Sequence, residues 1–198
     1  MEAVTPRRVS VLDALNFITL WFKRPRTIGA VTPSSRRLAA AIAREVDFAC
    51  AGTIVELGGG TGSITRALVE NAGSKTDIVV IEREPSLCAL LSARFPGIRV
   101  IQGDAGNLRK LLAEAGVGPV AAVVSGLPLL SLSRYSGSRI IRESFAALTP
   151  DGVFVQFTYG MVSPIRPSQA QRVGITGRRA GWVLRNLPPA ALWCFRHA

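Results

Sequence analysis

Apolar and polar positions along this chain alternate between strand-like and helix-like spacing. Five short apolar runs follow residue 52, and stretches with helical spacing separate them. The runs are TIVEL (53–57), DIVVIE (77–82), IRVIQ (98–102), VAAVVS (120–125) and GVFVQFTY (152–159), with helical stretches near 62–72, 85–95, 106–115 and 135–148. This alternation is typical of a parallel sheet with helices on both faces. Two apolar runs around Pro188 and Pro189 predict final strands near 181–187 and 191–196, completing a mostly parallel, seven-stranded α/β fold.

Two helices are predicted before the first strand. Residues 9–22 form an amphipathic pattern whose apolar stripe consists of Val11, Leu15, Ile18 and Phe22. Basic residues bracket this segment, and Pro25 ends it. A second helix is expected from the Thr32-Pro33-Ser34-Ser35 turn to about Val46. We therefore expect an amphipathic helix within residues 1–26 and one globular domain at residues 27–198.

Composition narrows the class of protein. The chain has 198 residues, of which 48% are apolar and 19% charged, so it can bury a core and is not disordered. Its formal net charge of +11 favours a partner rich in phosphate, either nucleic acid or an anionic membrane. Three cysteines without a CxxC pair and one histidine supply no zinc ligand set, so we expect no metal. The cysteine usage fits the cytosol, and we expect no signal peptide.

One uncharged stretch, residues 115–133, is nearly long enough to span a bilayer. Gly116, Gly118, Pro119, Gly126 and Pro128 interrupt it. The pattern therefore predicts a buried strand with loops in place of a membrane helix.

A glycine-rich loop follows the first strand and carries the main functional signal. The sequence E-L-G-G-G-T-G (56–62) places glycines where a ligand approaches the backbone at the carboxyl end of a strand. Ser63 stands where a dinucleotide fingerprint requires its third glycine, so the spacing does not match that motif. Glu56 would repel a pyrophosphate but attract a cofactor with an ammonium and a sulfonium. S-adenosylmethionine has both groups.

Polar residues also close the next three strands. Glu82 lies 20 residues beyond Gly62, the spacing at which an acid meets ribose hydroxyls in nucleotide-binding α/β folds, and we expect it to accept both. Asp104 ends the third strand, where it could accept from an adenine amino group, and Ser125 ends the fourth. Because parallel strands end at one edge of a sheet, we expect these side chains to converge on a single crevice with Glu56.

These residues resemble those of the class I S-adenosylmethionine-dependent methyltransferases, a Rossmann-like fold, over roughly residues 50–160. A narrower resemblance covers most of the chain. The segments F-K-R-P-R-T-I-G-A-V-T-P-S-S (22–35), S-G-L-P-L (125–129) and F-V-Q-F-T-Y-G-M-V-S-P (154–164) are similar to bacterial phospholipid N-methyltransferases. This resemblance implies stepwise methylation of phosphatidylethanolamine toward phosphatidylcholine by a domain that docks on the inner face of the cytoplasmic membrane through its N-terminal helix.

The resemblance and the strand ends together give an expected set of functional residues. The cofactor-binding residues are Glu56, Gly58, Gly60, Thr61, Gly62, Glu82, Arg83, Asp104, Ala105 and Ser125. For catalysis we expect the carbonyls of Gly126 and Leu127, left free beside Pro128, to orient the amine, and Tyr159 to form an aromatic wall or accept a proton. For substrate and membrane contact we expect Trp21, Lys23, Arg24, Tyr135 and Arg142.

Three other functions remain open from the sequence. Methylation of the ornithine-lipid amine is a close variant of the leading hypothesis. An RNA adenine N6-methyltransferase agrees with the basic charge, but Gly126 and Leu129 stand where rRNA adenine dimethyltransferases have an asparagine and an aromatic residue, which makes nucleic acid a less favoured partner. The third is a basic lipid-binding module without activity, against which the intact Glu56, Glu82 and loop glycines argue.

Overall fold

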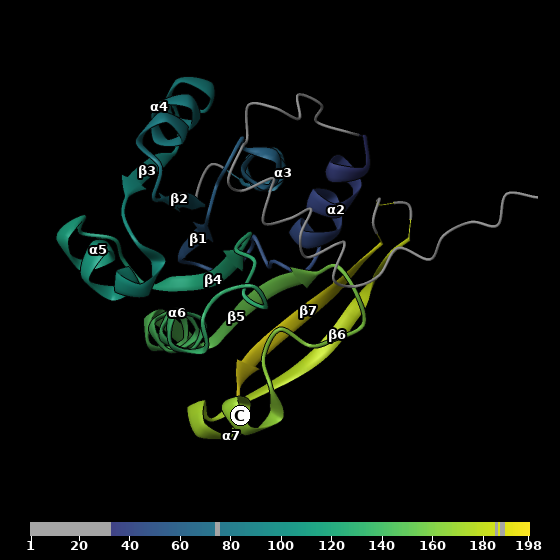
Figure 1. Ribbon diagram of the computed structural model, residues 1–198. Coiled ribbons are helices and arrows are strands. Elements are labelled where there is room, and N and C mark those ends of the chain that lie inside the picture. Colours follow the sequence, from purple (N-terminus) through teal and green to yellow (C-terminus); the bar gives the residue numbers. More distant parts are fainter. Residues whose placement is uncertain (1–32, 74–75, 185, 187–188) are drawn as a thin grey trace, which may run out of the picture.

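The computed structural model describes residues 33–73, 76–184, 186 and 189–198 and contains one seven-stranded mixed sheet (Figure 1). The strand order is β3-β2-β1-β4-β5-β7-β6, in which β1 to β5 are parallel and β7 runs antiparallel to both of its neighbours. The strands are β1 (Thr53–Leu57), β2 (Asp77–Glu82), β3 (Arg99–Gln102), β4 (Val120–Ser125), β5 (Leu148–Thr158), β6 (Ile175–Val183) and β7 (Ala190–His197). This order confirms the mostly parallel, Rossmann-like α/β fold expected from the sequence.

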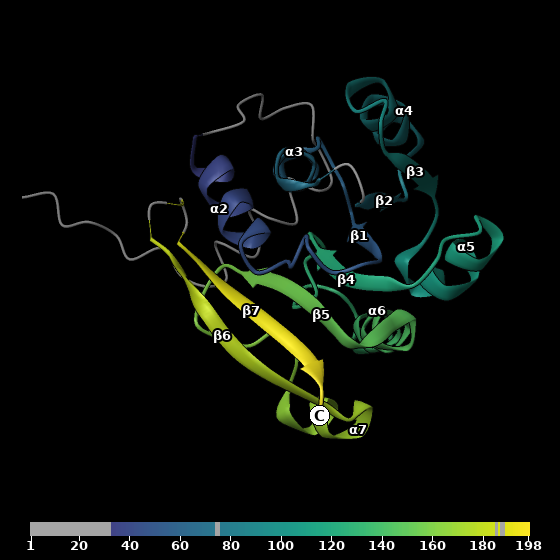
Figure 2. The same ribbon diagram turned by 180° about the vertical axis from the view of Figure 1, so that it is seen from behind.

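Helices cover both faces of the sheet (Figures 1 and 2). Residues of α2 (Pro33–Ala43), α3 (Ser63–Asn71) and α4 (Pro85–Arg94) pack into the apolar core on one face. Residues of α5 (Leu108–Glu114), α6 (Arg134–Ala147) and α7 (Pro167–Val173) pack into the core on the other. A 3₁₀ turn (Ala105–Asn107) precedes α5. With both faces covered, every residue of β1 is buried, which explains its continuous apolar run around Glu56.

The order of the strands reverses at β1. The chain moves outward from β1 to β2 and β3, then returns to place β4 on the other side of β1. Ligands of open α/β sheets bind outside the carboxyl ends of the strands at such a switch point. In register, Leu57 of β1 lies between Ile81 of β2 and Ser125 of β4, so the segments after these three strands begin side by side.

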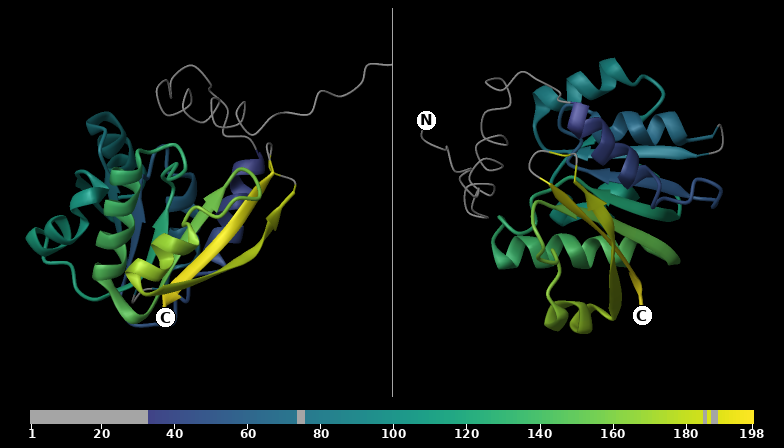
Figure 3. Two further views of the ribbon diagram at one scale, coloured as in Figure 1. Left: turned by 60° about the horizontal axis from the view of Figure 1, so that its bottom comes forward. Right: turned by 90° about the vertical axis from the view of Figure 1, so that its right-hand side faces the viewer.

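The final strand, β7, confirms the one predicted at 191–196, whereas β6 differs from the expectation. β6 begins at Ile175, six residues before the strand predicted at 181–187, and α7 was not predicted. The first half of β6 is mostly polar and exposed because it forms the outer edge of the sheet, visible as a long ribbon in Figure 3, so an apolar run could not reveal it. Gly177 fits there because the Phe195 ring of β7 occupies the space that a Cβ would need.

The uncharged stretch 115–133 is β4 with its flanking loops, as predicted. No helix in the described part of the chain has the length and apolar character needed to cross a bilayer. The amphipathic helix expected at 9–22, and with it the docking segment 1–26, lies outside the described residues.

The aromatic centre of one core provides a test of this packing. Phe154 on β5 is completely buried, with ring centroids 5.7 Å from Phe145 on α6 and 6.3 Å from Phe195 on β7. Phe154→Ala should lower the free energy of unfolding by about 3–5 kcal/mol, measured by urea denaturation, because it leaves a cavity that the sheet cannot close. Phe154→Leu should cost much less, and an equal cost for both variants would contradict this packing.

Candidate functional site

The glycine loop after β1 is held at the switch point by backbone geometry. Gly58 and Gly60 adopt left-handed conformations, with φ of 75° and 53°. At Gly58 the backbone N–H donates to the Ile81 carbonyl at 2.8 Å, and an added Cβ would lie 2.6 Å from a methyl of Leu127. At Gly60 nothing lies within 4 Å of such a Cβ. The space beside Gly60 that a side chain would fill is therefore open to a ligand, while Gly58 packs against the loop that follows β4.

Glu82 fixes the other side of this loop. Its Oε2 accepts from the Gly60 N–H at 3.0 Å, and its Oε1 accepts from the N–H groups of Arg83 and Glu84 at 2.8 and 2.9 Å. A carboxylate offers about four acceptor positions, so one remains, on Oε2. Glu82 is thus placed to accept from one ribose hydroxyl in this arrangement, whereas the sequence suggested two.

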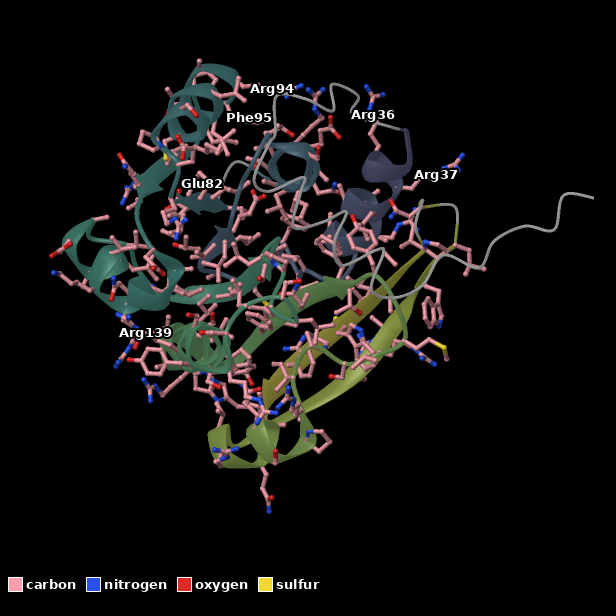
Figure 4. All side chains as sticks on the ribbon, in the orientation of Figure 1. Arg36, Arg37, Glu82, Arg94, Phe95 and Arg139 are labelled. Atoms are coloured by element: carbon pink, nitrogen blue, oxygen red, sulfur yellow. The ribbon has the colours of Figure 1, made fainter. Side chains whose placement is uncertain are left out.

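The outer side of the glycine loop packs against the C-terminal end of α4. Arg94 donates to the Thr61 carbonyl at 2.9 Å, and a Cβ at Gly62 would lie 2.6 Å from the Phe95 ring. Figure 4 shows Arg94 and Phe95 on the same side of the molecule as Glu82. The contacts of Thr61 and Gly62 therefore fix the shape of the glycine loop, and both residues offer backbone atoms to the site.

Glu56 is the most unusual group of the site. Its side chain is fully buried on β1, and Oε2 accepts from the Thr65 hydroxyl of α3 at 2.6 Å. Oε1 is buried with no partner among the described residues. Burial raises the pKa of Glu56 to about 8, an effect that the hydroxyl of Thr65 opposes and the charge of Glu82 increases. An unpaired carboxylate oxygen with a raised pKa is suited to meeting a cation, which would stabilise its charged form.

The end of β3 supplies the third predicted acid. Asp104 is exposed, and its Oδ1 accepts from the Gly106 N–H at 2.7 Å, which caps the 3₁₀ turn. Its Oδ2 has no partner among the described residues, so it can accept from an adenine amino group. Ala105, the first residue of this turn, is buried, and the Arg83 side chain is exposed after the end of β2. Arg139 of α6 donates to Asn107 of the same turn.

The segment after β4, which we call the acceptor loop (residues 125–129), differs from the expectation at one carbonyl. Ser125 is completely buried, and its hydroxyl accepts from the Leu127 N–H at 3.3 Å, so it orders the loop. The Leu127 carbonyl is not free, because Gln156 Nε2 donates to it at 3.0 Å and the Leu129 N–H at 2.9 Å. No described residue donates to the carbonyl of Gly126, which leaves that oxygen as the available acceptor.

The predicted aromatic residues lie in different environments. Tyr159 follows β5, packs its ring edge-on against Phe157 at 5.4 Å and hydrogen-bonds the Asn186 side chain. Burial raises the pKa of Tyr159, so its hydroxyl stays protonated at neutral pH and is a poor proton acceptor. Tyr135 and Arg142 are exposed on α6. Trp21, Lys23 and Arg24 lie outside the described residues.

This edge of the sheet has the features that S-adenosylmethionine requires. Glu56 has a buried oxygen with no described partner, Glu82 keeps one acceptor position for a hydroxyl, and nothing fills the space beside Gly60. Asp104 adds an open carboxylate oxygen at the next strand end. Among the described residues no cluster of side chains could hold a metal ion.

Comparisons with known proteins agree with this assignment. The chain is 32% identical over 149 residues to an ornithine lipid N-methyltransferase of Singulisphaera acidiphila, a match that covers 74% of this chain and 78% of the relative. A shorter match, 39% over 64 residues, covers 32% of this chain and 23% of a ribosomal RNA small subunit methyltransferase A of Chlorobium chlorochromatii. The family model of the TrkA-N domain matches residues 58–134, which begin at the glycine loop.

Among solved structures, the fold is similar to that of the 1,6-didemethyltoxoflavin-N1-methyltransferase of Burkholderia thailandensis, which was solved with S-adenosylhomocysteine. The TM-score is 0.65 at 14% identity, and the alignment covers 100% of this chain and 94% of that one. The chain therefore belongs to the class I S-adenosylmethionine-dependent methyltransferases, and its cofactor is S-adenosylmethionine. Within that class it shares a family with the ornithine lipid N-methyltransferase.

Two residues of the site were not identified from the sequence. Thr65 follows the glycine loop with no spacing that distinguishes it from an ordinary helix residue, yet it is the only described partner of the Glu56 side chain. Gln156 is a single polar residue inside the apolar run of β5. It is 2% exposed, donates to the carbonyls of Leu127 and Phe157, and its Oε1 is buried without a described partner. A polar residue inside an apolar run was the sequence signal that could have identified Gln156.

Titration of Glu56 should control stability. Because its pKa is about 8 in the folded state and near 4.5 when unfolded, the folded chain binds more protons between these values, and stability falls as pH rises through this window. The slope contributed by Glu56 is at most about 1.4 kcal/mol per pH unit. Glu56→Gln should remove this contribution in urea denaturation at several pH values, and an unchanged pH profile would contradict the raised pKa.

The same substitution should weaken cofactor binding. A neutral amide cannot form a charge-assisted hydrogen bond with a cation, so the affinity of Glu56→Gln for S-adenosylmethionine should fall about 10- to 100-fold in calorimetry. Glu84→Gln is a matched control, since the Glu84 side chain is exposed beside the site and accepts from the Ser86 hydroxyl at 3.3 Å. Equal affinities for both variants would exclude a role for Glu56 in binding.

Gln156 should act by positioning the acceptor loop. Gln156→Leu removes the amide that holds the Leu127 carbonyl, and we expect kcat to fall about 10- to 100-fold because small misplacements near reacting groups are costly. Cofactor affinity and thermal stability should stay near those of the wild type, since the variant also removes an unpaired buried oxygen. A loss of stability that parallels the loss of kcat would indicate a merely structural residue.

Proposed function

We propose that this methyltransferase acts on the amine of a membrane lipid, with ornithine lipid as its leading acceptor. The observation that carries the proposal is the 32% identity to an ornithine lipid N-methyltransferase across 74% of this chain and 78% of the relative. The similarity of its motifs to phospholipid N-methyltransferases, together with the net charge of +11, supports phosphatidylethanolamine as the second candidate. Both acceptors carry a primary amine on an anionic or zwitterionic lipid.

The acceptor loop supports a small aliphatic amine. Gly126 has no side chain, and a Cβ there would lie 2.9 Å from the Gly58 carbonyl, so the two loops pack closely. Leu129 is buried in the core, so it does not offer a surface on which a base could stack. An adenine acceptor would need stacking and hydrogen bonds to its edge, whereas an aliphatic amine needs one or two acceptors. The open Gly126 carbonyl can accept one N–H of such an amine.

Methyl transfer then depends on position and on the loss of one proton. When bound, S-adenosylmethionine would supply an electrophilic methyl group on a sulfonium, and the thioether S-adenosylhomocysteine would be the leaving group. An aliphatic ammonium has a pKa near about 10, so the amine must lose a proton before it can attack. Tyr159 cannot take that proton readily because burial raises the pKa of its hydroxyl, and we propose that water takes it. The contribution of the chain is to hold the amine at the acceptor loop, in line with the methyl group.

The test supplies purified protein with S-adenosylmethionine labelled in its methyl group. Separate reactions contain vesicles of ornithine lipid, vesicles of phosphatidylethanolamine, or unmodified ribosomal RNA, with anionic lipid in both vesicle preparations. We expect label in the organic phase, strongest with ornithine lipid. Glu82→Ala should lose most of the label because the glycine loop loses its anchor, and Glu84→Ala should not. Label in RNA alone would overturn the proposal.

A further inference from the structure

Exposed apolar side chains are concentrated at the edge of the sheet that holds the cofactor site. Eight large hydrophobic residues of the described chain are exposed, and six lie in the segments that follow β4 and β5 or at the end of β6. Because β6 is antiparallel to β7 and β7 to β5, β6 is parallel to β5 and ends at the same edge as β1, β4 and β5. We call these six residues the apolar rim: Leu130, Tyr135, Met161, Val162, Trp182 and Leu184.

The centre of the rim is held in place by hydrogen bonds. Met161 and Val162 are 73% and 62% exposed in the turn after β5. The Thr158 hydroxyl donates to the Val162 carbonyl at 3.2 Å and accepts from the Trp193 indole at 3.0 Å. The hydrogen bonds of Thr158 therefore fix this turn to β5 and β7. The side chains of Met161 and Val162 remain exposed although the apolar core lies beside the turn.

Trp182 connects this turn with the edge strand. It is in register with Ala191 of β7, which is in register with Thr158 of β5, so it lies two strands from Thr158, about 10 Å away. The Arg179 guanidinium lies over the Trp182 ring, 5.1 Å from its centroid. An aromatic ring paired with arginine suits the headgroup region of a membrane, where one end is apolar and the other wet.

Basic residues accompany the rim. Arg134 precedes Tyr135 at the start of α6, and Arg179 lies beside Trp182 on β6. Within the described part, Arg178 reaches Glu45 of the segment after α2, at 2.7 Å. An exposed apolar surface with basic neighbours complements an anionic lipid surface. Its apolar side chains can enter the boundary of the acyl chains, while the arginines remain at the lipid phosphates.

We propose that the apolar rim inserts into the surface of an anionic membrane and holds the cofactor edge of the sheet against the lipid. The inference deepens the proposed function, because a lipid amine must reach the acceptor loop from the membrane. It assigns this role to segments after β4, β5 and β6, independently of residues 1–26. Docking can also be measured without any methyl acceptor.

The test measures binding to vesicles of phosphatidylcholine and phosphatidylglycerol, which contain no primary amine. Met161→Glu combined with Val162→Glu should reduce co-sedimentation with these vesicles about tenfold or more, since it replaces inserted apolar groups with repelled charges. The control combines Val69→Glu and Leu90→Glu on α3 and α4, which are 37% and 43% exposed away from the rim. The control should bind like the wild type. Equal binding by all three proteins would overturn the proposal.

Two further measurements distinguish membrane docking from misfolding and from dimer formation. Calorimetry with S-adenosylmethionine should give the same affinity for the rim variant and the wild type, which shows that the variant is folded. If light scattering shows a wild-type dimer that the rim variant cannot form, and vesicle binding is unchanged, the rim is an interface between two copies and the proposal is wrong. If the rim binds vesicles but no lipid receives label, docking stands and the proposed lipid substrate fails.

Discussion

The burial of the Glu56 carboxyl group at the end of the central strand is the constraint on which the site depends. Glu56 is fully enclosed and has one hydroxyl, that of Thr65, for its two oxygens. Burying an incompletely paired acid is costly, and the chain retains it beside a loop whose other side is fixed by Glu82. We propose that a positively charged cofactor supplies the missing partner. Three features hold the backbone of the glycine loop between Glu56 and Glu82. They are the left-handed glycine conformations, the contact of Gly58 with Leu127, and the packing of α4 against the loop.

Much of this arrangement followed from the sequence because it depends on local pattern. Strands buried on both faces must be apolar throughout, so β1, β2 and β4 were visible as runs, and Glu56 and Glu82 stood out as acids at their ends. The beginning of β6 was not visible, because an edge strand exposes polar residues and its pairing with β7 is a tertiary contact. The roles of Thr65 and Gln156, and the occupied Leu127 carbonyl, depend on which segments the fold brings together, and no spacing encodes that.

The fold also relates the two proposals to each other. Parallel strands place their following segments at one edge, so the glycine loop, the acceptor loop and the apolar rim share it by topology. The segments after β1 and β2 lie beside the buried acids Glu56 and Glu82, whereas those after β4, β5 and β6 carry the exposed apolar rim. Such a gradient suits an enzyme that takes a soluble cofactor and a lipid amine at adjacent places.

Glu56 should become charged when the cofactor binds. With a pKa of about 8 in the free protein, Glu56 is mostly protonated at pH 7, and pairing with a cation should release its proton. Calorimetric titration with S-adenosylmethionine at pH 7, in two buffers with different enthalpies of ionisation, counts the protons released. The difference between the wild type and Glu56→Gln should be close to one proton per cofactor. No difference would mean that Glu56 does not change its charge on binding, and the account of this site would be wrong.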